Sequence, residues 1–220
     1  VVYMMFPNNV LNWPVVTGCF RISTGCNSCP SYWEYFEEGK DYTPVVHEDI
    51  LGEPLMNPEP STYEVAFGSD LFHNDVTLEF QRKVFEIMNK AHWHSFSVGT
   101  KRIARTALLH FNFEWTENIQ LTVGMESGEY DWRLEILKGI PAKKKAVSIV
   151  PILGPFDSDI DFTGIDIVGV APETWGYKRP HNPQWIEHIK RRCLEQEITV
   201  SDNTILYSHE GNKTHAVRQV

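Results

Sequence analysis

Three of the four cysteines lie close together near the start of the chain. Cys19, Cys26 and Cys29 fall within the segment TGCFRISTGCNSC, with six residues between the first two and two between the last pair. Thiols clustered in this way most often hold a metal ion or an iron–sulfur cluster, particularly where a reducing environment disfavours disulfides. The first question is what would need three thiols and not a fourth.

Two kinds of metal centre differ in the number of protein ligands that they need. A structural zinc site takes four protein ligands, so a fourth would come from His47, His73 or Cys193. An iron–sulfur cluster held by three cysteines leaves one iron open to a ligand from outside the protein. In radical S-adenosylmethionine (SAM) enzymes the methionyl amine and carboxylate of SAM fill that position. Their usual spacing is three residues and then two, so spacing alone leaves both kinds of centre open.

Composition indicates a single globular domain over residues 1–220, because 42% of the 220 residues are hydrophobic. No apolar run is long enough to span a membrane, and the opening VVYMMFPNNVLNWP lacks the pattern of a signal peptide. We therefore expect a cytoplasmic protein with no membrane partner. The formal net charge of −9 restricts any contact with nucleic acid to a local basic surface.

Apolar strands alternate with amphipathic helices along the chain, which predicts parallel strands joined by helices. An initial strand at residues 10–16 gives about six such units, so we expect an α/β fold: a partial (βα)6 open barrel with outer helices. A flat doubly wound sheet is the main alternative. The expected strands are residues 61–69, 95–100, 118–125, 145–153 and 165–172, and the expected helices are residues 77–92, 101–111, 130–140 and 182–197. Thr77 and Asn182 suit helix N-caps.

Polar side chains follow several of the predicted strands, and the carboxyl ends of parallel strands meet at one rim. Taken singly, each of these residues is as well explained as a helix cap or a surface group. Their joint position favours a functional site. Besides the three cysteines the set comprises Ser69, Asp70, His73, Thr100, Lys101, Arg102, Glu126, Ser127, Pro151, Glu173 and Trp175.

Longer segments resemble a phage-associated family of short radical SAM proteins. The resemblance begins with NWPVVTGCFRISTGCNSC and continues through GSDLFHNDV, GTKRIAR, LTVGMES, PILGP, DIVGVAPETWG and RPHNPQWI in the same order. It covers most of the chain. Two departures stand out: Cys29 is followed by Pro30 and Ser31 instead of Tyr and Ala, and IVPILGP lacks the Cys and Glu of the family pattern.

The resemblance implies a radical SAM-type open barrel whose [4Fe-4S] cluster is bound by Cys19, Cys26 and Cys29. It also implies SAM as cofactor, a 5′-deoxyadenosyl radical as its product, and an electron donor such as flavodoxin or ferredoxin. In this interpretation the SAM carboxylate pairs with Lys101 or Arg102, and Ser69 and Asp70 hold its amine. Glu126 and Ser127 then hold the ribose, and Thr100 completes the cofactor site.

Phage members of such families are associated with hypermodification of thymine in DNA. The leading specific hypothesis is therefore an isomerase that converts an amino-acid adduct of thymidine from a nitrogen-linked to a carbon-linked form. A loop with aromatic and cationic side chains suits a nucleotide substrate; we assign Glu173, Trp175, Lys178 and Arg179 to it, with His73 nearby. Two alternatives stay open: a radical SAM enzyme acting on a small molecule or protein, and a non-catalytic zinc-binding module.

Overall fold

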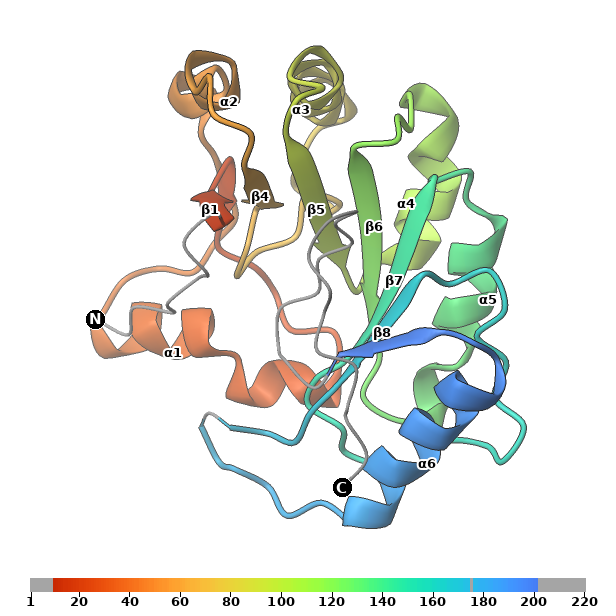
Figure 1. Ribbon diagram of the computed structural model, residues 1–220. Coiled ribbons are helices and arrows are strands. Elements are labelled where there is room, and N and C mark those ends of the chain that lie inside the picture. Colours follow the sequence, from red (N-terminus) through yellow and green to blue (C-terminus); the bar gives the residue numbers. More distant parts are fainter. Residues whose placement is uncertain (1–9, 175, 202–220) are drawn as a thin grey trace.

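Seven parallel strands form the centre of the molecule in a computed structural model, which describes residues 10–174 and 176–201 (Figure 1). Each strand pairs in parallel with its neighbours, and β1 and β9 are the edges, so the sheet is open. This confirms the predicted α/β fold with parallel strands. In spatial order the strands are β1 (Val10–Trp13), β4 (Thr62–Val65), β5 (Ser95–Thr100), β6 (Ile119–Gly124), β7 (Lys144–Ile149), β8 (Ile167–Val170) and β9 (Thr199–Ser201).

The helices expected between the strands are present. Thr77 Oγ1 accepts a hydrogen bond from Phe80 N, and Asn182 caps the last long helix through Gln184 N, so both predicted caps are confirmed. Figure 1 shows these long helices along one side of the sheet and α1 apart from them. The helices are α1 (Pro30–Glu37), α2 (Glu53–Met56), α3 (Leu78–Lys90), α4 (Ile103–Leu109), α5 (Trp132–Gly139) and α6 (Pro183–Glu195), with 3-10 turns at Thr24–Ser28, Glu48–Ile50, His110–Asn112 and Gly128–Tyr130.

The structure departs from the predicted elements at several places; the strand expected over 145–153, for example, ends at Ile149. The strand expected over 61–69 ends at Val65, because Ala66 and Gly68 have φ angles of 53° and 78° and turn the chain. The segment 10–16 is broken after Trp13, and β2 (Val16–Thr17) pairs antiparallel with β3 (Val45–Val46) in a separate ribbon. Finally, β9 extends the sheet to a seventh strand that the sequence pattern did not indicate.

Alternate residues of the strands face different surroundings. Phe96, Val98, Leu121 and Val123 are buried in the hydrophobic core, where burying each side chain stabilises the fold by roughly 1.5–3 kcal/mol. The residues between them are small or polar, and they line a cavity at the carboxyl ends of the strands: Ser97, Gly99, Thr122 and Gly124. The alternation thus gives one apolar face for the helices and one face for a site.

We expect Thr77→Ala to lower the free energy of unfolding by about 1 kcal/mol, because the amide of Phe80 loses its side-chain acceptor. Urea unfolding followed by circular dichroism measures this difference. Thr77→Ser keeps the hydroxyl and serves as the matched control. Equal midpoints for the wild type and Thr77→Ala would show that the cap contributes nothing.

Candidate functional site

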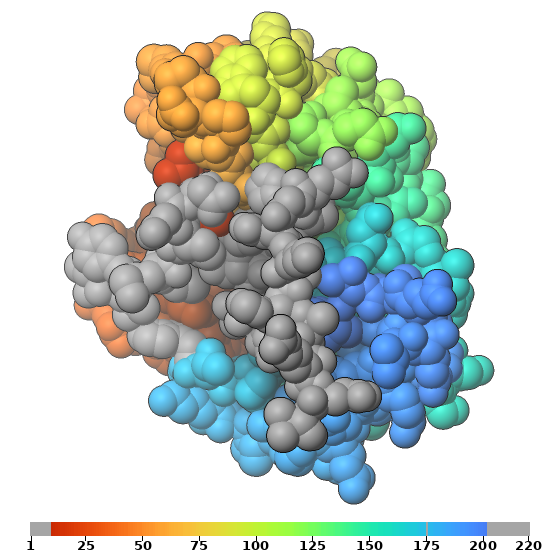
Figure 2. Space-filling view, viewed as in Figure 1, coloured from red at the N-terminus to blue at the C-terminus, as the bar shows by residue number. Residues whose placement is uncertain are grey.

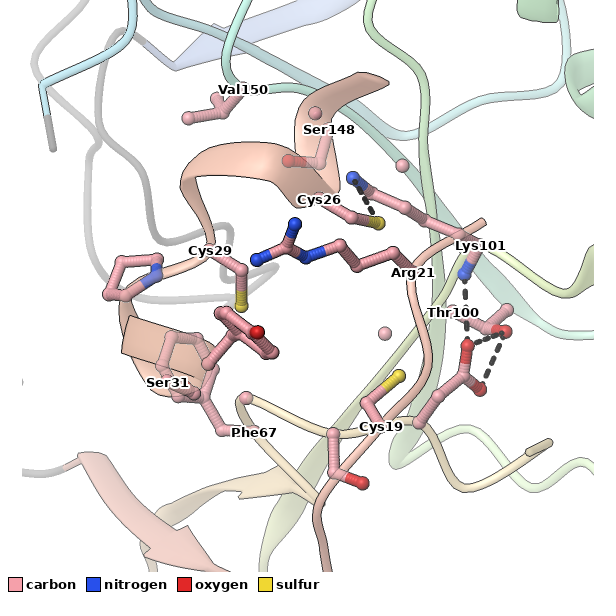
Figure 3. A pocket seen from close by; sticks show the side chains of 18 of the residues that line it. Cys19, Arg21, Cys26, Cys29, Ser31, Phe67, Thr100, Lys101, Ser148 and Val150 are labelled. Carbon is pink, nitrogen blue, oxygen red and sulfur yellow. Dashed lines mark hydrogen bonds between the residues drawn. The ribbon is translucent and has the colours of Figure 1, made fainter. Parts of the chain in front are cut away.

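The three clustered cysteines line one cavity of about 540 Å³. Its walls come from the cysteine segment, the start of α1, and the carboxyl ends of β4, β5, β6 and β7. Figure 3 shows the sulfur atoms of Cys19, Cys26 and Cys29 around the same space. The parallel strands therefore do bring the thiols and the strand ends to one rim.

Two glycines allow the cysteine segment to lie against the rest of the protein. Gly18 has a φ of +76°, and a Cβ there would lie 2.3 Å from Thr43 O. The next amide, that of Cys19, donates to Tyr42 O at 2.9 Å. A Cβ on Gly25 would lie 2.3 Å from Glu126 Oε1. Only glycine fits at these two points, so the segment that carries the thiols is held in close backbone contact.

Cys26 is surrounded by groups that favour its thiolate. Lys101 Nζ lies 3.8 Å from the sulfur, and the Ser23 hydroxyl lies 3.4 Å from it. Burial raises the pKa of the Cys26 thiol, but the Lys101 ammonium and the Ser23 hydrogen bond outweigh burial, so the pKa lies below its usual value. A thiolate is the form that binds a metal.

Cys19 is buried to a similar extent, but the charges around it differ. Arg102 Nη1 donates to the Cys19 sulfur at 3.4 Å. Burial raises the pKa of this thiol, and the favourable charge of Arg102 is offset in part by the nearby carboxylate of Asp70. The pKa of Cys19 therefore lies above its usual value, whereas the pKa of Cys26 lies below it.

Asp70 is the centre of a buried hydrogen-bond network. Its carboxylate accepts from Thr100 Oγ1 at 2.9 Å, from Phe72 N at 2.9 Å and from Arg102 Nη1 at 3.1 Å. Ser69 Oγ donates to Gly18 O and so links β4 to the cysteine segment. Ser69, Asp70, Thr100 and Arg102 all line the cavity. The predicted cofactor residues of β4 and β5 are thus brought together with the thiols.

Glu126 lies behind the cavity wall, at 1% exposure, and is not among the lining residues. It forms an ion pair with Lys101, accepts from Ser23 Oγ at 2.6 Å, and faces Arg133 Nη1 at 3.5 Å. Burial lowers the pKa of Lys101, but the charge and hydrogen bond of Glu126 together with the charge of Cys26 outweigh burial and raise the pKa above its usual value. Ser127 does not line the cavity either. Glu126 thus contacts the site through Lys101 and Ser23.

The loop after β8 is placed beside the cysteine segment, as the space-filling view also shows (Figure 2). Glu173 lines the cavity and pairs with Arg179, whose Nη1 also donates to Thr24 O at 3.0 Å. Burial is secondary here: the hydrogen bond from Arg179 keeps the pKa of Glu173 below its usual value. Lys178 is exposed, and Trp175 lies outside the described residues.

The remaining candidates do not reach the cavity. His73 is 2% exposed, accepts from Asp75 N at 3.1 Å and contacts the ring of Phe20. His47 is hydrogen-bonded to Thr17, and Cys193 lies on the buried face of α6 in the core. None of these three potential zinc ligands lines the cavity of the thiols. Within residues 10–174 and 176–201, no three His, Cys, Asp or Glu side chains gather tightly enough to hold a single metal ion.

Several cavity residues were not identified from the sequence. Four polar residues within the strands line the cavity: Glu64, Ser97, Thr122 and Ser148. Polar residues that alternate with apolar ones inside buried strands were the available signal. Arg21 also lines the cavity, in the stretch between the first two cysteines. The prediction considered only residues that follow the strands. It therefore missed the four residues within the strands and Arg21, which lies between two cysteines.

The three thiols, with two cations within hydrogen-bond reach of two of them, fit an iron–sulfur cluster. The donor set is sulfur only, as such clusters require, and hydrogen bonds to the sulfurs are a common feature of their sites. The cavity, which falls within the range of small-molecule sites, leaves room for a cofactor beside them.

Solved structures of spore photoproduct lyase have a similar fold. The complex with a dinucleoside spore photoproduct matches with a TM-score of 0.52 and 16% identity, over 81% of this chain and 59% of that one. A tyrosine-to-phenylalanine mutant matches with 0.53 and 17%, over 84% and 61%. The chain thus spans about three fifths of the length of these structures. At this identity the likeness shows the fold alone, and the open α/β fold with parallel strands expected from the sequence is confirmed.

Among curated proteins, no sequence matches the chain. A family model described as "Protein of unknown function (DUF5131)" matches residues 8–201. Since this range covers most of the 220 residues, the chain belongs to that family.

Proposed function

We propose that this protein is a radical SAM enzyme. The observation that carries the proposal is the placement of three thiols around one cavity at the carboxyl ends of parallel strands. The fold shared with spore photoproduct lyase supports it. Cys19, Cys26 and Cys29 would hold a [4Fe-4S] cluster, which together with SAM supplies a 5′-deoxyadenosyl radical after reduction by a donor such as flavodoxin or ferredoxin. Free thiols of this kind suit the cytoplasm, of a host cell if the protein is phage-encoded.

The residues of the cavity have separate tasks in this proposal. Lys101 and Arg102 donate to the sulfur atoms of Cys26 and Cys19, and we propose that their N–H groups lie beside the position of the SAM carboxylate. Ser69 and Asp70 lie on the wall nearest Cys19 and suit the SAM amine, with Thr100 fixing the Asp70 carboxylate. We assign Glu126 a supporting role through Lys101, while Ser127, which follows it in the chain, does not line the cavity.

For the substrate we propose an amino-acid adduct of thymidine in phage DNA. In the isomerisation, the bond from the methylene carbon on thymine C5 to the amino-acid nitrogen breaks, and a bond from that carbon to the amino-acid α-carbon forms. The α-carbon loses one hydrogen and the nitrogen gains one, so the reaction is redox-neutral. The similar structure of spore photoproduct lyase was solved with a dinucleoside photoproduct, which supports a nucleotide-sized substrate.

For the position of such a substrate we propose the side of the cavity that Glu173 and Thr174 line, in the loop after β8. Glu173 is at the cavity wall, held by Arg179, and Lys178 adds exposed positive charge next to them. His73 stays outside the cavity, so we assign it a structural role next to Phe20. An extruded base can stack on aromatic rings in a channel of this kind even though the whole chain is acidic.

Anaerobic reconstitution with iron and sulfide tests the cofactor. We expect a brown wild-type protein with about four iron atoms per chain that cleaves SAM on reduction. Cys19→Ser, Cys26→Ser and Cys29→Ser each lose most of the iron and all SAM cleavage, because each removes a ligand. Cys193→Ser is the matched control and retains both, since Cys193 is buried in the core away from the cavity. A colourless wild type that retains one zinc per chain would instead establish the zinc-binding module.

Gly25→Ala tests whether the close contact of the cysteine segment matters. The new Cβ would lie 2.3 Å from the buried carboxylate of Glu126, so the segment must shift. Crowding of this kind costs about 1–3 kcal/mol, and we expect iron loading well below that of the wild type with an unchanged far-ultraviolet circular dichroism spectrum. At Gly52, where a Cβ meets nothing within 4 Å, alanine is the control. Wild-type iron loading in Gly25→Ala would contradict this account of the segment.

The substrate is tested by mass spectrometry of digested DNA. DNA carrying a nitrogen-linked amino-acid adduct of thymidine is incubated with the reconstituted enzyme, SAM and reductant. We expect a nucleoside of the same mass with a different retention time and fragments that show the carbon link. If the enzyme cleaves SAM but the adduct is recovered unchanged, the substrate is a small molecule or a protein and the DNA proposal is wrong.

A further inference from the structure

Arg21 lies in the six-residue stretch between Cys19 and Cys26, which is longer than the usual three residues of radical SAM proteins. Its guanidinium carbon is 3.8 Å from the centre of the Tyr32 ring on α1. Both residues line the cavity. Figure 3 shows the Arg21 side chain directed into the same space that the three sulfur atoms surround.

The other cations of the cavity wall are neutralised by carboxylates of the chain. Lys101 is paired with Glu126 and Arg102 with Asp70, and the side chains of both carboxylates are at most 4% exposed. Arg21 forms no ion pair with any residue that the structure describes, and its residue is exposed. Its positive charge is therefore available to a ligand, whereas those of Lys101 and Arg102 are compensated internally.

The contact with Tyr32 fixes where that charge is presented. A guanidinium stacked on an aromatic ring keeps its in-plane N–H groups directed outward, and these match the oxygens of a carboxylate or phosphate in pairs. Tyr32 also lies in an aromatic group on α1, with Phe36 stacked on it and Trp33 at 5.9 Å. The site is a planar cation against a wall of rings.

We propose that Arg21 and Tyr32 form an oxyanion-binding site in the wall of the cavity. This deepens the proposed function and rests on it. Two ligands present the required chemistry: the phosphate of a nucleic-acid substrate and the carboxylate of SAM. A polar floor further inside, with Glu64 and Ser97, is unsuited to an anion because of the Glu64 carboxylate.

Binding measurements on Arg21→Gln test the site without relying on turnover. The first is fluorescence anisotropy of a labelled single-stranded oligothymidine, titrated at several salt concentrations with protein as purified. The second is equilibrium dialysis of radiolabelled SAM with anaerobically reconstituted protein. Arg21→Lys keeps the charge but loses the paired N–H groups of the guanidinium. Its affinity should therefore lie between that of the wild type and that of Arg21→Gln. Arg82→Gln, which changes an exposed arginine on α3 that does not line the cavity, is the control.

Because Arg21→Gln loses a charge-assisted contact, we expect its affinity for one of the two ligands to be at least about tenfold lower than that of the wild type. If the ligand is phosphate, oligothymidine binding weakens and the slope of log K against log salt falls by about 0.7, while SAM binding is unchanged. If the ligand is the SAM carboxylate, only SAM binding weakens. Unchanged affinity for both ligands, or a wild type that binds neither, overturns the site.

The result is separable from the test of the proposed function. A wild type that binds these ligands but fails to cleave SAM refutes the radical reaction, and the anisotropy and dialysis results still decide the role of Arg21. Conversely, an enzyme that cleaves SAM with unchanged binding in Arg21→Gln keeps the proposed function and loses the oxyanion site.

Discussion

Two buried ion pairs, Lys101 with Glu126 and Arg102 with Asp70, connect the cysteine segment to the sheet. The four partners follow three neighbouring strands: Asp70 comes after β4, both cations after β5 and Glu126 after β6. A buried charge is tolerated only when it is paired, and removing one member leaves the other uncompensated. Each cation also donates to a thiol, so the positions of Cys19 and Cys26 depend on the register of three parallel strands.

The two pairs give the thiols unequal electrostatic environments. Burial raises the pKa of Cys19 beyond what Arg102 can offset, whereas Lys101 and Ser23 bring the pKa of Cys26 below its usual value. Metal binding requires deprotonated sulfur, and a bound metal ion itself promotes loss of the proton. Cys26 is thus available as a thiolate earlier, and Cys19 would complete its deprotonation as the metal centre forms.

The sequence predicted the arrangement where local patterns determine it. Helix α3 has its apolar residues at helical spacing and a threonine cap, and both features formed as expected. The convergence of Asp70, Thr100, Lys101 and Arg102 followed from the geometry of parallel strands. Side-chain direction did not follow: His73 turns into the protein beside Phe20, and Glu126 lies behind the wall because Lys101 and Arg133 neutralise it there. These outcomes depend on partners distant in sequence, which no local pattern contains.

Contacts between residues distant in sequence also position the elements around the opening of the cavity. Helix α1 has no buried residue although it carries four aromatic side chains, so packing against a core is not what holds it. Its aromatic side chains contact Tyr42 in the segment that follows and Tyr177 in the loop after β8. Arg179 of that loop also donates to Thr24 O in the cysteine segment. Because the sheet is open at β1 and β9, these contacts across the gap bring the cysteine segment and the loop after β8 together. An opening built from exposed rings and loops can admit a substrate larger than the cavity itself, with only its reacting part inside.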